Sequence, residues 1–338
     1  MILVTGSTGY LGAHLLYELT KAGKTVRAMF RNSNRISLVR SVFSYYESDY
    51  QQLFEKIEWI QSDILDYYSL NDSMKEASQV YHVAGLVSFN SNDRKKLNSI
   101  NVKGAANVVN ACIENGVDKL CHVSSIAALG EAESPELADE KLIWKQSDTA
   151  SAYRKSKFLG EMEVWRGIHE GLNAVIVNPS VIIGPGMWLG PGKELLYRVQ
   201  KGLKYYPSGS SGYVDVRDVA RVMVLLTEGS YSGERYIINS ENITHRYYLN
   251  LIANALDKPM PSRVISPLLG KIAVGAEFLR SAITGLPPRI DKQTIRIAAE
   301  NLAYSNDKVR EATGISFISA EESVKTAIKL YLKEQGAA

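Results

Sequence analysis

Cysteine, net charge and long apolar runs are all scarce in this chain. Its 338 residues include two cysteines and carry a formal net charge of +3. Cys112, in a predicted helix, and Cys121, in a predicted buried strand, give no disulfide framework, so we expect both to stay reduced in a cytoplasmic protein. Basic and acidic residues are interspersed, which argues against nucleic-acid binding. No apolar run reaches the roughly 20 residues that a membrane-spanning helix needs.

The sequence also lacks internal repeats and low-complexity tracts. Its first residues already have the pattern of a strand, so no signal or transit peptide is expected. Hydrophobic residues make up 45% and charged residues 22% of the chain, which are ordinary values for a globular protein. The length predicts about two domains.

The most informative motif that is present lies at the N-terminus. The β-favouring run 2–5 leads into Gly6, Gly9 and Gly12, and a helical pattern covers 10–21. Gly6 permits a tight turn, Gly9 lets the backbone approach a pyrophosphate, and Gly12 lets the helix pack closely on the strand. The helix N-terminus adds free N–H groups and a partial positive charge. This combination predicts a dinucleotide-binding site.

Apolar strands alternate with helical patterns through the first half, which predicts an α/β fold with a doubly wound parallel sheet. Strands are expected near 25–30, 57–61, 79–83, 118–124 and 173–178, and helices near 66–77, 94–115 and 149–171. The aromatic-rich stretch 41–56 is interpreted as an extra helix packed on the sheet edge rather than as a ligand surface.

The pattern changes after Gly184, where strands are expected to give way to helices. We predict a dinucleotide-binding domain over 1–183, to which 213–239 returns, and a smaller, mostly helical lobe over 184–212 and 240–338. The helices are expected near 193–203, 216–229, 245–256, 268–284, 290–301 and 320–335. This lobe would cover the carboxyl ends of the strands, where open α/β sheets bind ligands.

A tyrosine and a lysine share one face of the predicted helix 149–171. Tyr153 and Lys157 lie one turn apart. A free phenol is a poor acid–base catalyst at neutral pH, but a nearby ammonium and a positive nicotinamide ring would lower its pKa. Such a pair could exchange a proton with a carbonyl or an alcohol while a hydride moves.

The spacing of Tyr153 and Lys157 is not unique, because Tyr17, Tyr197 and Tyr304 also have a lysine four residues on. Those three are expected to lie on solvated helix faces. Tyr153 differs because the strand 118–124 ends in Ser124 and Ser125 just before its helix. A hydroxyl at a strand end could hydrogen-bond the reacting oxygen.

These residues together resemble the extended short-chain dehydrogenase/reductase family over essentially the whole chain. The matching motifs are Thr5-Gly6-x-x-Gly9-x-x-Gly12, His122-Val-Ser-Ser125 and Tyr153-x-x-Ser-Lys157. The resemblance implies catalytic roles for Ser125, Tyr153 and Lys157, with Asn101 supporting a proton-relay water. Counting back from Gly130 assigns the serine to Ser125, with Ser124 as the alternative. The implied cofactor contacts are Gly6, Thr8, Gly9, Tyr10, Leu11, Gly12, Arg31, Asp63, Ile64, Ala84, Gly85, Tyr153, Lys157 and Pro179, and no metal is implied.

The end of the second predicted strand bears on the choice of cofactor. NAD enzymes of this fold usually place an acidic residue there, to bind the ribose hydroxyls. This chain has Arg31, which could pair with a 2′-phosphate, and Asn32, Ser33 and Arg35 could complete that pocket. The alternative is a solvated surface arginine. We therefore predict NADP(H) over NAD(H).

Three positions distinguish the branches of the family. Asn178 stands where sugar-nucleotide enzymes typically carry an arginine, and Ser211-Gly212 stands where they commonly have Arg-Asp. Ile126 and Ala127 replace the acidic residues of the dehydratases. The chain therefore resembles the dihydroflavonol reductase and 3β-hydroxysteroid dehydrogenase branch. The leading hypothesis is a reductase or dehydrogenase for a small apolar or phenolic substrate; the alternatives are a sugar-nucleotide 4-epimerase and a non-catalytic dinucleotide sensor.

Three features of the predicted lobe and helices leave alternatives open. Met187, Trp188 and Tyr205 would either line the substrate pocket or fill the lobe. The apolar stripe of the predicted helix 268–284 fits a core face, a lid or a helix lying on a membrane surface. Its residues are Leu268, Leu269, Ile272, Ala276, Leu279 and Ile283. Homodimerisation through helices 94–115 and 149–171 is common in the family and stays open.

Overall fold

The computed structural model describes most of the chain. It covers residues 1–338 except 89, 131–136, 145–150, 191, 267–268, 271, 273, 276, 278–279, 281–291 and 337–338. The apolar stripe therefore falls largely outside the described residues, which exclude Leu268, Ala276, Leu279 and Ile283. Ile272, which is described, is 59% exposed.

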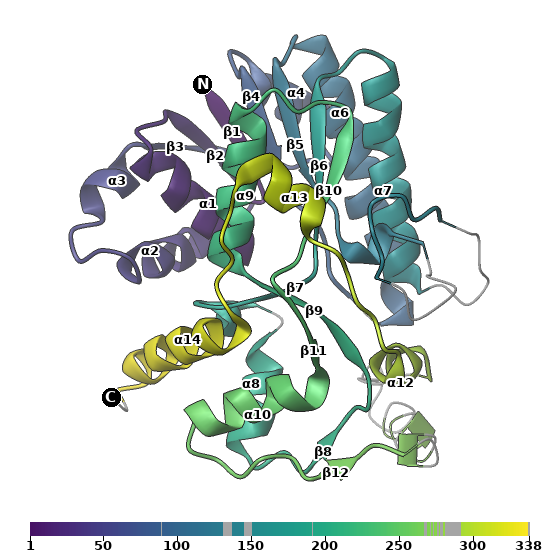
Figure 1. The fold of residues 1–338 in the computed structure, drawn as a ribbon. Helices are drawn as coiled ribbons and strands as arrows, with labels where there is room; N and C mark the ends of the chain where they lie inside the picture. Colours follow the sequence, from purple (N-terminus) through teal and green to yellow (C-terminus); the bar gives the residue numbers. More distant parts are fainter. Residues whose placement is uncertain are drawn as a thin grey trace.

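A parallel sheet of seven strands, in the order β10-β6-β5-β4-β1-β2-β3, forms the centre of the molecule (Figure 1). The strands are β1 (Ile2–Thr5), β2 (Val26–Phe30), β3 (Ile57–Gln61), β4 (Gln79–His82), β5 (Lys119–Val123), β6 (Ala174–Pro179) and β10 (Glu234–Ile238). Every neighbouring pair is parallel. The predicted doubly wound α/β fold is confirmed.

Helices cover both faces of this sheet, which explains why its central strands are apolar on both sides. The side chains of Leu3 and Val4 point to opposite faces of β1, and both are fully buried. One face packs against α1 (Tyr10–Lys21) and α9 (Val216–Glu228). The other packs against α4 (Tyr67–Met74), α6 (Gly104–Glu114) and α7 (Ala152–His169).

The aromatic stretch forms two short helices, α2 (Ile36–Ser44) and α3 (Gln51–Glu55), rather than the single helix predicted. Both pack on α1. The ring of Tyr17 stacks on that of Tyr46 with centroids 3.7 Å apart. This packing leaves Tyr17 1% exposed, and Tyr304 is 8% exposed elsewhere in the fold. The prediction that these two tyrosines lie on solvated helix faces is therefore wrong. Tyr197, which is 55% exposed, does face solvent.

Further helices of the described residues are α5 (Arg94–Leu97), α8 (Gly192–Gln200), α10 (His245–Ala255), α12 (Lys292–Ala299), α13 (Asp307–Thr313) and α14 (Ala320–Glu334). Single 3-10 turns lie at Ser33–Arg35, Ser91–Asp93, Ile126–Ala128 and Met187–Leu189, and a π-helical segment lies at Asn98–Lys103. An apolar cluster joins α8, α10 and α14 below the sheet in Figure 1. Met187 and Trp188 are buried in that cluster, whereas Tyr205 is 36% exposed.

The helical character predicted after Gly184 is confirmed, but the sequence did not predict several short strands in and just before this half. A second sheet, β11-β9-β7, and a two-stranded pair, β12-β8, lie in this half. Their strands are β7 (Val181–Ile183), β8 (Tyr205–Tyr206), β9 (Ser210–Asp215), β11 (Glu241–Thr244) and β12 (Arg263–Val264). All five are short, and β9 and β11 begin with serine, glycine, glutamate or asparagine instead of the apolar residues that mark a strand in sequence. The proposed domain boundaries stay a prediction.

Among the helices of the described residues, none combines the length and the apolar character that crossing a bilayer requires. Cys112 and Cys121 are both buried and free.

Candidate active site

The glycine turn after β1 leaves no room for side chains. Gly6 has a φ of +66°, and a Cβ there would lie 2.5 Å from the backbone nitrogen of Ala84. A Cβ at Gly12 would overlap the carbonyl oxygen of Gly6. The N–H of Gly9 donates to the carbonyl of Gly6 over 2.9 Å, and α1 begins there without a side-chain cap. The uncapped N–H groups of α1 thus form a cradle that fits a pyrophosphate.

Other predicted cofactor residues surround this turn in different ways. Thr8 and Gly9 line a small hollow together with Arg35. Tyr10 also borders this hollow, its ring packs edge-on against His14 with centroids 5.5 Å apart, and Leu11 is buried in the core. Only the backbone of Tyr10 and Leu11 can therefore face a bound phosphate.

The carboxyl ends of β2, β3 and β4 bring further predicted residues to the same edge of the sheet. Asp63 Oδ1 accepts from the N–H of Leu65 over 3.0 Å, and its Oδ2 lies 3.9 Å from Arg31 Nη1. The Ala84 N–H donates to Thr5 Oγ1 over 3.3 Å. Ile64 is buried against Gly104, where a Cβ would lie 2.5 Å from its Cδ1. Ligands bind at this edge in open α/β sheets.

Ser125 and Tyr153 meet at the carboxyl end of β5. Ser125 follows this strand, and Tyr153 lies in the first turn of α7, which Ser151 caps by accepting from the N–H of Arg154. Burial raises the pKa of the Tyr153 phenol, and a side-chain hydrogen bond with Ser125 lowers it. The Ser124 hydroxyl donates elsewhere, to Glu161 Oε2 over 2.5 Å.

Lys157 lies one turn beyond Tyr153, with its ammonium buried. Its Nζ donates to the carbonyl of Val123 over 2.9 Å. Burial lowers its pKa to about 8, and the Glu161 carboxylate opposes that shift. We expected Lys157 to lower the pKa of the Tyr153 phenol. Burial has the larger effect, and the pKa of the phenol is raised.

Gly85 and Asn101 lie beside Lys157. A Cβ at Gly85 would lie 3.9 Å from Lys157 Nζ and 3.5 Å from Asn101 Oδ1. Asn101 lies in the π-helical segment, a feature often found at functional sites. Its Oδ1 accepts from the N–H of Leu86 over 2.8 Å, and its Nδ2 donates to Ser156 Oγ over 3.0 Å. The Asn101 side chain is thus engaged in holding the chain after β4 against α7.

The structure adds two polar residues to the site that sequence reasoning did not assign to it. Asn178, in β6 just before the buried Pro179, donates to the carbonyl of Ser125 over 3.0 Å and to Glu161 Oε2 over 2.8 Å. Glu161 is fully buried one turn after Lys157. The signal available in sequence was the four-residue spacing of Tyr153, Lys157 and Glu161, which puts all three on one helix face.

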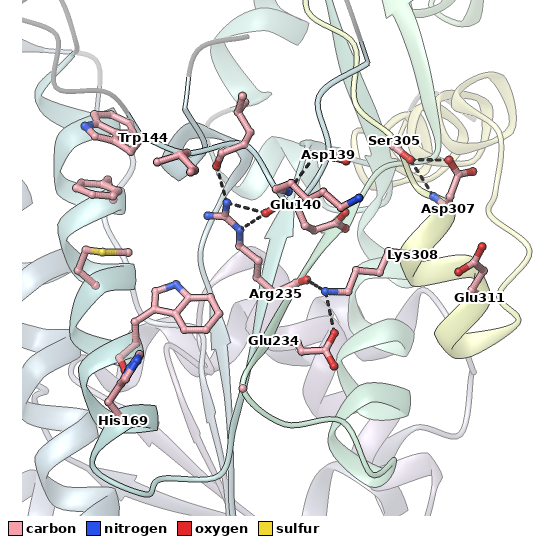
Figure 2. Close-up of a pocket in the computed structure, with 17 residues that line it drawn as sticks. Asp139, Glu140, Trp144, His169, Glu234, Arg235, Ser305, Asp307, Lys308 and Glu311 are labelled. Atoms are coloured by element: carbon pink, nitrogen blue, oxygen red, sulfur yellow. Dashed lines mark hydrogen bonds and ion pairs between the residues drawn. The ribbon is translucent and has the colours of Figure 1, made fainter.

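A cavity of about 970 Å³ lies at the free edge of β10, between α7, α13 and residues 139–144 (Figure 2). Trp144 forms part of an aromatic wall, stacked on Phe158 with centroids 4.6 Å apart. The facing wall is charged: Lys308 Nζ lies 2.9 Å from Glu234 Oε2, and Arg235 donates to the carbonyl of Glu140. Each of these charges has a partner in the protein itself.

The fold and its phosphate cradle indicate an enzyme class that transfers hydride with a nicotinamide dinucleotide. Residues 2–239 match the family model described as the NAD dependent epimerase/dehydratase family. The chain belongs to this family, in its extended short-chain dehydrogenase/reductase branch, and is an NAD(P)-dependent oxidoreductase.

Relatives of similar length include several named reductases. The chain is 27% identical to a "Putative dihydroflavonol 4-reductase" from Synechocystis sp. over 331 residues, 96% of this chain and 92% of that protein. It is 26% identical to cinnamoyl-CoA reductase 1 from Arabidopsis thaliana over 346 residues, covering 99% and 90%. It is also 27% identical to sterol demethylase protein B from Methylococcus capsulatus over 340 residues, covering 99% and 98%.

Solved structures share this fold over the whole chain. The crystal structure of gox2253 superposes with a TM-score of 0.81 at 25% identity, covering 100% of this chain and 99% of that one. The Bordetella bronchiseptica enzyme WbmH in complex with NAD+ superposes with a TM-score of 0.74 at 18% identity, covering 99% of both chains. The second likeness concerns the fold alone.

Proposed function

We propose that this protein is an NADP(H)-dependent reductase of a carbonyl group on a small apolar or phenolic substrate. The observation that supports it best is the Ser125–Tyr153 hydrogen bond at the carboxyl edge of the sheet, one helical turn from a buried lysine. A phenol whose pKa is raised by burial stays protonated at neutral pH and can donate its proton to a carbonyl oxygen. That state suits reduction better than alcohol oxidation.

The proposed mechanism assigns each residue one task. The glycine cradle and the N-terminus of α1 would hold the pyrophosphate, and the bound dinucleotide supplies the hydride. Ser125 orients the substrate oxygen, and Tyr153 donates its phenolic proton to that oxygen. Lys157, one turn away, stabilises the phenolate that remains.

Two exposed arginines support a preference for NADP(H). Arg31 follows β2, and its side chain is 65% exposed. Arg35 lines the hollow beside Thr8 and Gly9. Both can reach a phosphate on the ribose, and a bidentate guanidinium recognises such a group well. Asn32 accepts from the N–H of Asn34 through Oδ1, so its Nδ2 is the group that can donate to such a phosphate.

The substrate class rests on two positions without an arginine. Asn178 is engaged with Ser125 and Glu161, and a Cβ at Gly212 would meet the amide of Asn239. Neither position offers a cation to a diphosphate. The reductase names of several relatives agree with a substrate that lacks one.

The test is NADPH consumption across a panel of ketones and aldehydes, including phenolic and aliphatic members. Tyr153→Phe should lower kcat by about 100-fold or more, the usual contribution of a general acid. Tyr197→Phe is the matched control, because Tyr197 also has a lysine four residues on but is 55% exposed. It should leave kcat unchanged.

Two results would contradict the proposal. Conversion of a sugar nucleotide at constant NADPH would identify a 4-epimerase instead. Tight dinucleotide binding without turnover of any carbonyl, unaffected by Tyr153→Phe, would identify a non-catalytic sensor.

A further inference from the structure

Glu161 is a fully buried carboxylate on α7, two turns after Tyr153 and one turn after Lys157. Removing a carboxylate from water costs several kcal/mol unless hydrogen bonds and opposite charges replace the lost hydration. Four side-chain donors from four elements converge on it.

Those donors come from β5, β6, β10 and α7 itself. The Ser124 hydroxyl donates to Oε2 over 2.5 Å and the Asn178 amide over 2.8 Å. Arg235 Nη1 donates to Oε1 over 3.1 Å, and the Trp165 indole N–H donates to the same oxygen over 3.3 Å. The carboxylate thus links the catalytic helix to three neighbouring strands.

Arg235 also donates hydrogen bonds to backbone carbonyls of the segment 139–144, as Figure 2 shows. Its Nε and Nη2 donate to the carbonyl of Glu140 over 3.0 and 2.8 Å, and Nη2 also donates to the carbonyl of Leu142 over 2.6 Å. Its side chain is 15% exposed. A guanidinium with this many fixed partners has one orientation, so the position of the Glu161 carboxylate is fixed too.

Both flanks of Ser125 are tied to Glu161. Ser124, the preceding residue, donates to the carboxylate directly. Asn178 donates through one Nδ2 to both the carboxylate and the carbonyl of Ser125. The backbone that presents the Ser125 hydroxyl to Tyr153 is therefore anchored on the same carboxylate.

We propose that Glu161 is the positioning residue of this site: held by Arg235, it fixes the backbone of Ser125 and supplies the buried negative charge that keeps Lys157 an ammonium. This inference rests on the proposed Ser125–Tyr153–Lys157 chemistry. It adds a residue that touches neither substrate nor cofactor but controls two groups that do.

The charges around Lys157 agree with that assignment. Burial lowers the lysine pKa to about 8, and Glu161 raises it. His82 and His122 also face Lys157, but burial lowers the pKa of His82 to about 3 and that of His122 well below its ordinary value. Both histidines are consequently neutral at pH 7. Among the charges that the described residues place around Lys157, Glu161 is the one that favours the ammonium.

The first test measures Lys157 directly, without substrate. Protein labelled with ¹³C at lysine Cε is titrated by NMR as wild type, as Glu161→Gln and as the control Glu163→Gln. Glu163 lies on the same helix and pairs with the surface residue Arg166 over 3.0 Å. The pKa of Lys157 should fall by about one unit or more in Glu161→Gln, as expected when a nearby opposite charge is lost. Glu163→Gln should not change it.

The second test separates positioning from binding. In Glu161→Gln, kcat for carbonyl reduction should fall about ten-fold or more, equivalent to roughly 1.4 kcal/mol of barrier, while KM for NADPH and for the carbonyl changes little. The high-pH limb of the kcat profile should move to lower pH together with the Lys157 pKa. Glu163→Gln should keep the wild-type profile.

Glu161→Gln leaves Arg235 without its counter-charge, so a variant that keeps the ion pair is included. Ser124→Ala removes one donor and retains both charges, so it should lower kcat several-fold without moving the Lys157 pKa. A wild-type pKa for Lys157 in folded Glu161→Gln, or wild-type kcat in Ser124→Ala, would overturn the inference. Absence of turnover in the wild type would instead refute the proposed function, and the NMR titration would still decide the role of Glu161.

Discussion

Tyr153 experiences two opposing influences on its pKa, and burial is the larger of the two. Burial raises the pKa, and the hydrogen bond with Ser125 lowers it. Because burial dominates, the phenol is a proton donor at neutral pH. In the proposed mechanism the Ser125 hydroxyl donates a hydrogen bond to the phenolate that forms once the proton has left.

Arg31 provides a residue-level test of cofactor choice. Arg31→Ser should lower kcat/KM for NADPH by about 10- to 100-fold, since a hydrogen bond to a charged group contributes about 1.5–3 kcal/mol. The value for NADH should stay within about two-fold, because NADH has no 2′-phosphate to lose. Arg40→Ser, a change of an exposed arginine on α2, is the control. Equal losses with both cofactors would refute the assignment of Arg31.

At this scale the sequence predicts residues whose type and spacing are unusual, and misses those defined by their surroundings. The motifs around Ser125 and Tyr153 are recognisable because each needs a fixed residue at a fixed step. Glu161 shares the four-residue spacing of Tyr153 and Lys157, but nothing in the sequence indicates that its carboxylate is buried. Its burial depends on Arg235, which lies 74 positions away in the chain. The burial of Tyr17 could not be predicted for the same reason, since its stacking partner Tyr46 comes from another part of the chain.

The first strand, turn and helix form an element whose backbone excludes side chains. Gly12→Ala should cost about 1–3 kcal/mol of unfolding free energy through overpacking, because the added methyl overlaps the Gly6 carbonyl. It should also weaken NADPH binding, measured by fluorescence titration, since the cradle would open. Gly275→Ala is the matched control: a Cβ there meets nothing within 4 Å. An unchanged affinity in Gly12→Ala would show that the turn does not hold the dinucleotide.

Elements with a strong period were predicted well, and elements without one were not. The buried strands β1, β4, β5 and β6 are rich in β-branched, aromatic and other apolar residues, so the sequence identifies them. Strand β9 begins Ser210-Ser211-Gly212 and pairs with β7 in parallel and with β11 in antiparallel. Its stability comes from those partners and from burial in the fold, which local propensity does not record.

At the scale of the whole molecule, His14 joins separate parts of the chain. Its Nε2 donates to the carbonyl of Pro185 over 2.9 Å, and its Nδ1 accepts from the Tyr46 hydroxyl over 2.5 Å. The carbonyl can only accept, so Nε2 carries the proton. Burial lowers the pKa of His14 to about 4. The folded protein therefore keeps this histidine neutral in mildly acidic solution.

This neutrality predicts acid sensitivity. Between pH 6.5 and about 4, His14 is protonated in the unfolded chain and neutral in the folded chain. The free energy of unfolding therefore falls as the pH falls through this window. His14→Gln should reduce the slope of unfolding free energy against pH by up to about 1.4 kcal/mol per unit, measured by urea denaturation. The buried His82, His122 and His245 add to the slope in the same direction, because burial lowers the pKa of each, whereas Asp218, whose pKa burial raises to about 6, opposes it. His169→Gln, at an exposed position, should keep the wild-type slope, and an unchanged slope in His14→Gln would contradict this account.

Two charged side chains hydrogen-bond to the backbone at the free edge of β10. Its Ile237 N–H donates to Glu140 Oε1 over 2.8 Å, and its Arg235 carbonyl accepts from Lys308 Nζ over 2.9 Å. An unpaired parallel edge is a template on which a foreign strand can add. Here the groups that would receive such a strand are already occupied by a carboxylate and an ammonium. This border of the sheet is thereby protected from intermolecular strand pairing and from the aggregation that follows it.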